Sequence, residues 1–109
     1  MSRRRLTLLA VALGPLLGVL GPGAAAPAPS THTVRMEATS FQPADFAVRV
    51  GDTVVWRNED PFPHTATSTA FDSKVVAAGG SWRYTPRAKG AFPYVCALHP
   101  TMKGTLRVE

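Results

Sequence analysis

The chain has 109 residues, which favours a single domain. Its formal net charge of +5 comes from 12 Lys and Arg against 7 Asp and Glu, and Arg3, Arg4 and Arg5 supply three of the positive charges. Without those three, the balance falls to 9 basic against 7 acidic residues, which removes most of the support for a nucleic-acid-binding protein.

The first 25 residues are typical of a signal peptide. Three arginines precede an apolar run from Leu6 to Leu20 and the small-residue stretch from Gly21 to Ala28. The apolar run is shorter than the roughly 20 residues that span a bilayer, and we expect cleavage after Ala25. The segment is similar to both a general secretory and a twin-arginine signal, and a retained anchor is a third alternative. We therefore expect a periplasmic or otherwise exported protein with no membrane span after cleavage.

Residues 26–31 predict a short proline-rich linker, and residues 32–109 predict one folded domain. A domain of this size has a small core, so a bound metal would help to stabilise it. Cys96 is the one cysteine of the sequence, which excludes an internal disulfide. In an exported protein such a thiol is an intermolecular bridge, a buried inert group or a metal-bound thiolate.

Apolar residues alternate with their neighbours in six short segments, which predicts β-strands. These residues are Val34 and Met36; Phe46, Val48 and Val50; Val54 and Trp56; Trp82 and Tyr84; Phe92, Tyr94 and Cys96; Leu106 and Val108. Because Gly, Pro, Asp and Asn interrupt this period of two at short intervals, we expect an all-β sandwich or barrel. Residues 66–78 could hold a short helical turn.

Four residues form a candidate metal site. Cys96, His99 and Met102 follow a predicted strand with two residues between each pair, and His64 lies upstream at the start of another predicted strand. Two imidazoles, a thiolate and a thioether are the donor set of a type 1 copper site. Taken singly, each residue is more simply explained as core, cap or surface loop, but the four together predict one bound copper ion.

Residues 32–109 resemble the cupredoxins, and among them the small amicyanin, pseudoazurin and plastocyanin group. The segments that carry the resemblance are 41–43, 50–56, Asn58, Asp60, His64 and 94–104. The two-residue gap between His99 and Met102 is similar to that of amicyanin, since the other two have a longer loop. The resemblance implies a Greek-key β-sandwich with copper at one end. Many members have Asn after the first histidine, whereas this chain has Thr65, whose hydroxyl can bond locally.

We expect a monomeric, non-enzymatic carrier that shuttles single electrons by Cu(I)/Cu(II) cycling. Its redox partners, a donor and an acceptor, are expected to dock near His99. The candidate docking residues, for which ordinary loop packing is an equal alternative, are Pro61, Phe62, Pro63, Leu98 and Pro100. A copper-delivery protein of the same fold and a metal-free interaction domain are the alternative functions.

Three expectations concern the surroundings of the site. The Cys96 sulfur should accept one or two backbone N–H bonds, which tune the reduction potential. His99 should lie on an exposed loop, where its ring edge gives electrons a way out. His32 is assigned no ligand role and is expected to be solvated near the mature N-terminus.

Overall fold

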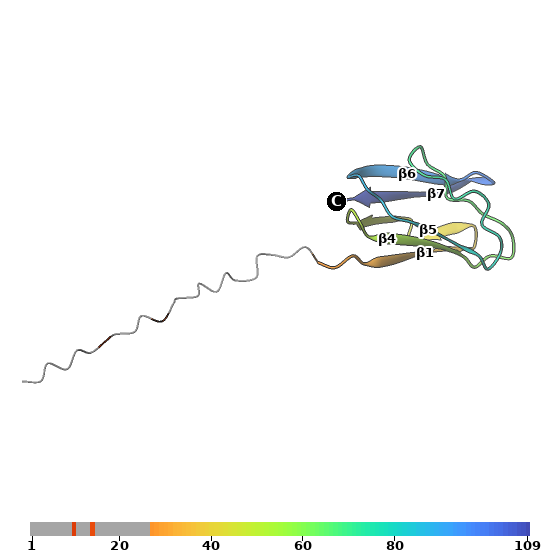
Figure 1. The fold of residues 1–109 in the computed structure, drawn as a ribbon. Coiled ribbons are helices and arrows are strands. Elements are labelled where there is room, and N and C mark those ends of the chain that lie inside the picture. The colour runs from red at the N-terminus through yellow and green to blue at the C-terminus, as the bar shows by residue number, and fades with distance from the viewer. Residues whose placement is uncertain (1–9, 11–13, 15–26) are drawn as a thin grey trace, which may run out of the picture.

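The computed structural model describes Ala10, Gly14 and residues 27–109. The predicted signal peptide and its cleavage site after Ala25 lie outside the described residues, and the linker and domain boundaries stay predictions. Seven strands form two sheets that pack face to face as a sandwich (Figure 1). In the described part of the chain, no helix has the length and hydropathy needed to cross a membrane.

The two sheets have mixed strand directions. In chain order the strands are β1 (Thr31–Glu37), β2 (Ser40–Gln42), β3 (Asp45–Val48), β4 (Thr53–Asn58), β5 (Ser81–Tyr84), β6 (Gly90–Cys96) and β7 (His99–Val108). One sheet has the order β2-β1-β4-β5 and the other has the order β3-β7-β6. The pairs β1–β4 and β3–β7 are parallel, and the remaining pairs are antiparallel. The expected all-β Greek-key sandwich is therefore confirmed.

Three local features differ from the sequence prediction. The strand β3 ends at Val48, so Val50 lies outside it, with 43% of its surface exposed. Residues 66–78 form no helical turn; their order comes from isolated bridges, such as the one between Thr67 and Asp72. The strand β2 was not predicted, because three residues are too few to show a period of two.

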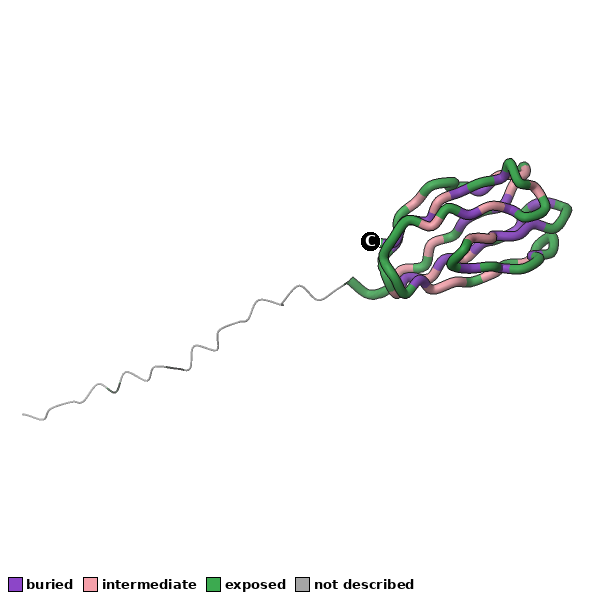
Figure 2. Tube along the Cα trace, turned by 90° about the horizontal axis from the view of Figure 1, so that it is seen from above, coloured by how far each residue is buried: buried purple, intermediate pink, exposed green. Residues whose placement is uncertain are grey.

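The core is built from aromatic side chains on the inner faces of both sheets. Trp56 on β4 and Tyr94 on β6 are almost fully buried, and their rings meet edge to face with centroids 5.6 Å apart. Burial raises the pKa of Tyr94 to about 12. A Cβ at Gly104 would come within 2.6 Å of the Tyr94 ring, so only glycine fits there. Figure 2 shows buried residues alternating with exposed ones along the strands.

Asp52 stabilises the end of the sandwich where β1 and β4 begin. Its buried carboxylate accepts hydrogen bonds from the Ser30 amide (2.9 Å), the Arg49 amide (3.0 Å) and the His32 ring (2.9 Å). These three donors, in that order, hold the pKa of Asp52 well below its usual range. The prediction that His32 is simply solvated was wrong, because its ring forms a hydrogen bond with the buried Asp52 carboxylate.

We expect the free energy of unfolding of Asp52→Asn to fall less steeply with decreasing pH than that of the wild type. Because the folded-state pKa lies below the ordinary 3.8, the carboxylate stabilises the fold fully above that value, and this contribution is lost as pH falls through the folded pKa. Urea unfolding of the copper-free protein at several pH values between about 7 and 2 measures the slope. Asp45→Asn on the exposed start of β3 is the control. An Asp52→Asn slope equal to that of wild type would contradict this account.

Candidate metal centre

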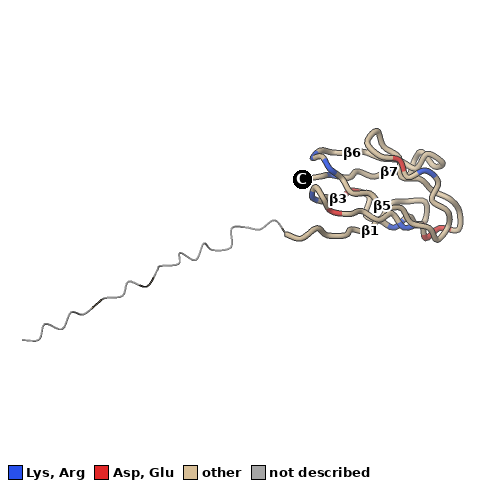
Figure 3. The backbone as a smooth tube through the Cα atoms, viewed as in Figure 1, with Lys and Arg blue, Asp and Glu red and all other residues tan. Residues whose placement is uncertain are grey.

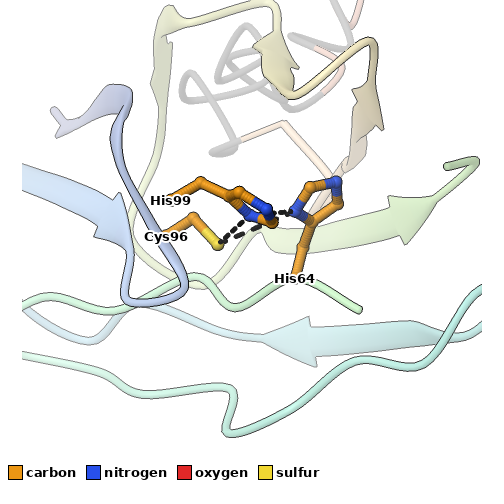
Figure 4. Close-up of side chains that lie close together, drawn as sticks. All are labelled: His64, Cys96 and His99. Carbon is orange, nitrogen blue, oxygen red and sulfur yellow. Dashed lines mark hydrogen bonds between the residues drawn. The ribbon is translucent and has the colours of Figure 1, made fainter. Parts of the chain in front are cut away.

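Three of the four predicted ligands converge at one end of the sandwich. One donor atom from each of His64, Cys96 and His99 lies within 4.8 Å of the other two. The side chains of His64 and Cys96 are fully buried, and His99 is partly exposed. Figure 4 shows the two rings and the sulfur pointing toward a common centre. The arrangement joins residues far apart in the sequence.

The tight connection between β6 and β7 places Cys96 and His99. The two residues face each other across the antiparallel pair, and only Ala97 and Leu98 lie between them. The connection is short, as predicted, but His99 was expected on an exposed loop, whereas it is partly buried and is the first residue of β7. The turn therefore fixes both donors to the rigid edge of a sheet.

His64 reaches the same point from a different segment. Its backbone forms an isolated antiparallel bridge with Val76, with both hydrogen bonds between 2.8 and 3.1 Å. Asn58 at the end of β4 supports this segment by donating to the carbonyls of Phe62 and Val76 at 2.9 and 3.0 Å. The prediction that His64 begins a strand was wrong, because its segment pairs through isolated bridges outside the seven strands of residues 27–109.

The spacing of the three donor atoms fits a metal ion. The two Nδ1 atoms of His64 and His99 lie 3.2 Å apart, and the Cys96 sulfur lies 3.7 and 3.6 Å from them. An ion about 2.0–2.1 Å from each nitrogen and about 2.3 Å from the sulfur requires donor atoms roughly 3.3–3.8 Å apart. Imidazole and thiolate donors in this ratio suit copper. The residues present therefore fit a type 1 copper ion.

Met102, the fourth predicted ligand, lies on β7 three residues after His99. It is the first fully buried side chain of that strand, with 2% of its surface exposed. A buried thioether at this position belongs to the same core as Cys96. The assignment of Met102 as a weak axial ligand stays a prediction.

Thr65 connects the two segments that carry the ligands. Its backbone N–H donates to the Cys96 sulfur at 3.3 Å, as expected for a thiolate ligand. Its hydroxyl accepts from the Ala97 amide at 2.8 Å and shares a hydrogen bond with the Thr67 hydroxyl at 2.9 Å. Thr65 therefore ties the two ligand-bearing segments together through its amide and its hydroxyl.

Asp60 orients the buried ring of His64. Its carboxylate lies 2.7 Å from Nε2 of His64, so this nitrogen carries the proton and Nδ1 is left free to bind metal. The carboxylate also accepts from the amides of Ala38 (2.8 Å) and Thr39 (2.9 Å). Burial opposes ionisation, but the bonds from His64, Thr39 and Ala38 outweigh it and lower the pKa of Asp60.

The orienting role of Asp60 was missed at the sequence level. In the sequence, Asp60 is identified only as one of the residues that carry the resemblance. Its spacing of four residues before His64 was visible, but the Pro61–Pro63 segment between them gave no regular period from which to infer contact. The structure shows that this irregular segment folds back so that the carboxylate meets the ring.

Comparisons with known proteins agree with this geometry. Residues 8–108 match the cupredoxin-like domain. The chain is 28% identical over 91 residues to amicyanin-alpha of Methylorubrum extorquens, covering 77% of this chain and 76% of that protein. A Cu(I) structure of an amicyanin mutant matches with a TM-score of 0.70 and 26% identity over 75% of this chain and 85% of that one. A Cu-containing nitrite reductase from Thermus scotoductus matches with a TM-score of 0.70 and 33% identity, over 80% of this chain but 24% of that one.

We expect Asp60→Asn to weaken copper binding and to raise the reduction potential. The substitution removes a negative charge 2.7 Å from the His64 ring and leaves that ring less firmly oriented, and loss of such a partner lowers metal affinity by roughly 10–100-fold. Competition with a chelator measures affinity and voltammetry measures potential. Asp72→Asn, which removes an acid with no contact to a ligand, should change neither. Equal behaviour of the two variants would contradict the role of Asp60.

Proposed function

The chain belongs to the cupredoxin-like domain family and is a small blue copper protein of electron transfer, and we propose that it carries single electrons between redox partners in an exported compartment. The proposed ligands of the ion are His64, Cys96, His99 and Met102. The observation that carries this proposal is the convergence of two Nδ1 atoms and one sulfur within 4.8 Å.

The donors are suited to an ion that changes charge in place. Copper, when bound, supplies the exchange of one electron between Cu(I) and Cu(II). Thr65 holds the sulfur and the following turn, while Asp60 holds the ring of His64. Because these contacts fix the donor atoms independently of the ion, the donors need to move little when its charge changes. Small rearrangement favours fast electron transfer.

The burial of the donors favours a carrier over a copper-delivery protein. Both His64 and Cys96 have 0% of their surface exposed. A delivery protein must let an incoming ligand reach the ion, and here only the side of His99 is open. We therefore propose that the ion stays bound while electrons pass.

We propose that partners dock around His99. Phe62 and Leu98 expose 38% and 49% of their surfaces, and the Phe62 ring lies 5.7 Å from that of His99. The neighbouring Pro61, Pro63 and Pro100 are also exposed. An apolar, desolvated contact around the one accessible ligand ring brings a partner close to the donors. Electrons would enter and leave through this ring.

Three finer properties belong to the same proposal. We propose that the protein acts as a monomer and not as an enzyme, because its proposed ligands are occupied by the ion and the small domain of residues 27–109 offers no further catalytic group beside them. The match to the Cu-containing nitrite reductase covers only 24% of that chain. Residues 1–25 are proposed to direct export to the periplasm or an equivalent compartment.

We expect the oxidised, copper-loaded protein to show an intense thiolate-to-copper charge-transfer absorption. Cys96 is the one thiol of the sequence, so Cys96→Ala should abolish the colour, whereas Ser81→Ala on the exposed edge strand should keep it. Visible spectroscopy before and after incubation with a weak chelator also tests retention of the ion. Colourless wild-type protein, or a coloured Cys96→Ala variant, would overturn the site; rapid loss of colour to the chelator would favour copper delivery.

We expect Met102→Gln to bind copper, keep the charge-transfer band with a shifted maximum, and lower the reduction potential. An amide oxygen is a harder donor than a thioether and favours Cu(II) over Cu(I). Voltammetry beside wild type measures the difference, and Met36→Gln, a buried methionine away from the ligand turn, controls for loss of core packing. An unchanged potential in Met102→Gln would show that Met102 is not a ligand.

A further inference from the structure

Several charged side chains at the metal end of the sandwich form ion pairs. Arg35 forms ion pairs with Glu37 and with Glu59, the latter at 2.7 Å. Lys74 pairs with Asp72 at 3.3 Å. Arg57, next to Asn58, and Lys103, next to Met102, are exposed and form no ion pair within residues 27–109, so some unpaired positive charge also lies near the copper ligands.

The opposite end carries basic side chains without acidic partners. Four exposed residues in three neighbouring segments form no ion pair within residues 27–109; we call them the basic end: Arg49, Arg87, Lys89 and Arg107. Figure 3 shows Lys and Arg at this end, near the C-terminus.

Backbone contacts bring the three segments of the basic end together. The amide of Gly51 donates to the Pro86 carbonyl at 3.0 Å, which joins the turn after Arg49 to the segment of Arg87. Arg107 faces Ala91 across the β6–β7 pair, which places it beside the segment of Lys89. The four cations therefore belong to one surface of the folded domain.

Acidic groups at this end neutralise the basic surface only in part. The Asp52 carboxylate is buried and already accepts three hydrogen bonds. Glu109 is exposed, with its backbone bonded to Val48 and Val50. The basic end therefore keeps an excess of exposed positive charge over exposed negative charge.

The N-terminal segment joins the domain at this same end. The Ser30 amide donates to Asp52, and the Ser30 carbonyl accepts from Thr53 at 2.9 Å. Val50, flanked by Arg49, exposes 43% of an apolar side chain here. Cations around an exposed apolar group match the chemistry of a lipid surface.

We propose that the basic end binds the anionic phospholipid headgroups of a membrane surface and thereby turns the metal end toward solution. Lysine and arginine near an anionic membrane are attracted to its phosphates within about one Debye length. An acidic protein would satisfy the charge but would not account for the exposed apolar side chain of Val50 at this end. The orientation leaves His99 free for a redox partner, and the binding does not require copper.

The test compares the binding of the full chain to anionic phosphatidylglycerol vesicles and to neutral phosphatidylcholine vesicles by co-sedimentation. Apolar contacts contribute to binding on both kinds of vesicle, so the ratio of the two affinities isolates the charge effect. We expect Arg49→Gln/Arg87→Gln to lower this ratio by roughly 25-fold, about five-fold for each cation lost. The matched control, Arg57→Gln/Arg83→Gln, removes the same charge from the outer sheet face and should change the ratio much less.

Three outcomes would overturn the proposal. The first is an equal loss in both double variants, which would reflect net charge alone. The second is an unchanged ratio in Arg49→Gln/Arg87→Gln. The third concerns polyglutamate, an acidic polypeptide. If Arg49→Gln/Arg87→Gln lost binding to polyglutamate but kept its binding to vesicles, the basic end would be a protein-docking surface.

Orientation on the membrane is tested with tryptophan reporters in copper-free protein. Brominated phosphatidylglycerol should quench the added emission of Val50→Trp at the basic end. The same lipid should leave that of Val75→Trp unquenched, since Val75 adjoins the Val76 strand partner of His64. Equal quenching of the two reporters would contradict the orientation. Neither co-sedimentation nor tryptophan quenching requires copper, so a negative result in either would leave the electron-transfer proposal intact.

Discussion

The hydrogen bonds of Thr65 are the constraint on which the metal site depends. One residue donates its amide to the Cys96 sulfur and accepts the Ala97 amide on its hydroxyl. The segment of His64 and the β6–β7 turn belong to distant parts of the sequence, and neither holds the other through a continuous strand. The backbones of Thr67 and Val95 also join these two parts through an isolated antiparallel bridge with two hydrogen bonds of 2.9 Å, and the Thr65 contacts extend this junction to the sulfur itself. Because hydrogen bonds are directional, they fix the separation of the sulfur and the His64 ring more closely than packing does.

The core behind the site makes this constraint effective. Tyr94, two residues before Cys96, packs on Phe41 with ring centroids 4.6 Å apart and on Trp56 at 5.6 Å. Trp56 in turn contacts Trp82 on the edge strand at 5.4 Å. Close-packed aromatic interiors deform little. The end of β6 therefore presents Cys96 from a rigid base, and the tether adjusts only the segment of His64 to it.

The sequence predicts those parts of the molecule that repeat or that carry unusual chemistry. The alternation around Trp56, Tyr94 and Leu106 is long enough to identify inner faces, and the spacing of Cys96 and His99 identifies the donor turn. Contacts that join segments of irregular backbone could not be predicted. The bond of His32 to Asp52 and the bond of Asp60 to His64 depend on where turns place side chains, which no periodic pattern encodes. The roles of Thr65 and Asp60 therefore became clear only in three dimensions.

The turn between β1 and β2 shares its anchor with a copper ligand. Ala38 and Thr39 both adopt positive φ, at 52° and 54°, a conformation that non-glycine residues rarely occupy. Their amides are held by the same Asp60 carboxylate that holds His64. A substitution at Asp60 therefore removes a hydrogen-bond partner from both the β1–β2 turn and the metal site. Glycine at Ala38 or Thr39 would relieve the strain and still donate its amide to Asp60, so the carboxylate would remain bound by the turn and by the ligand at once.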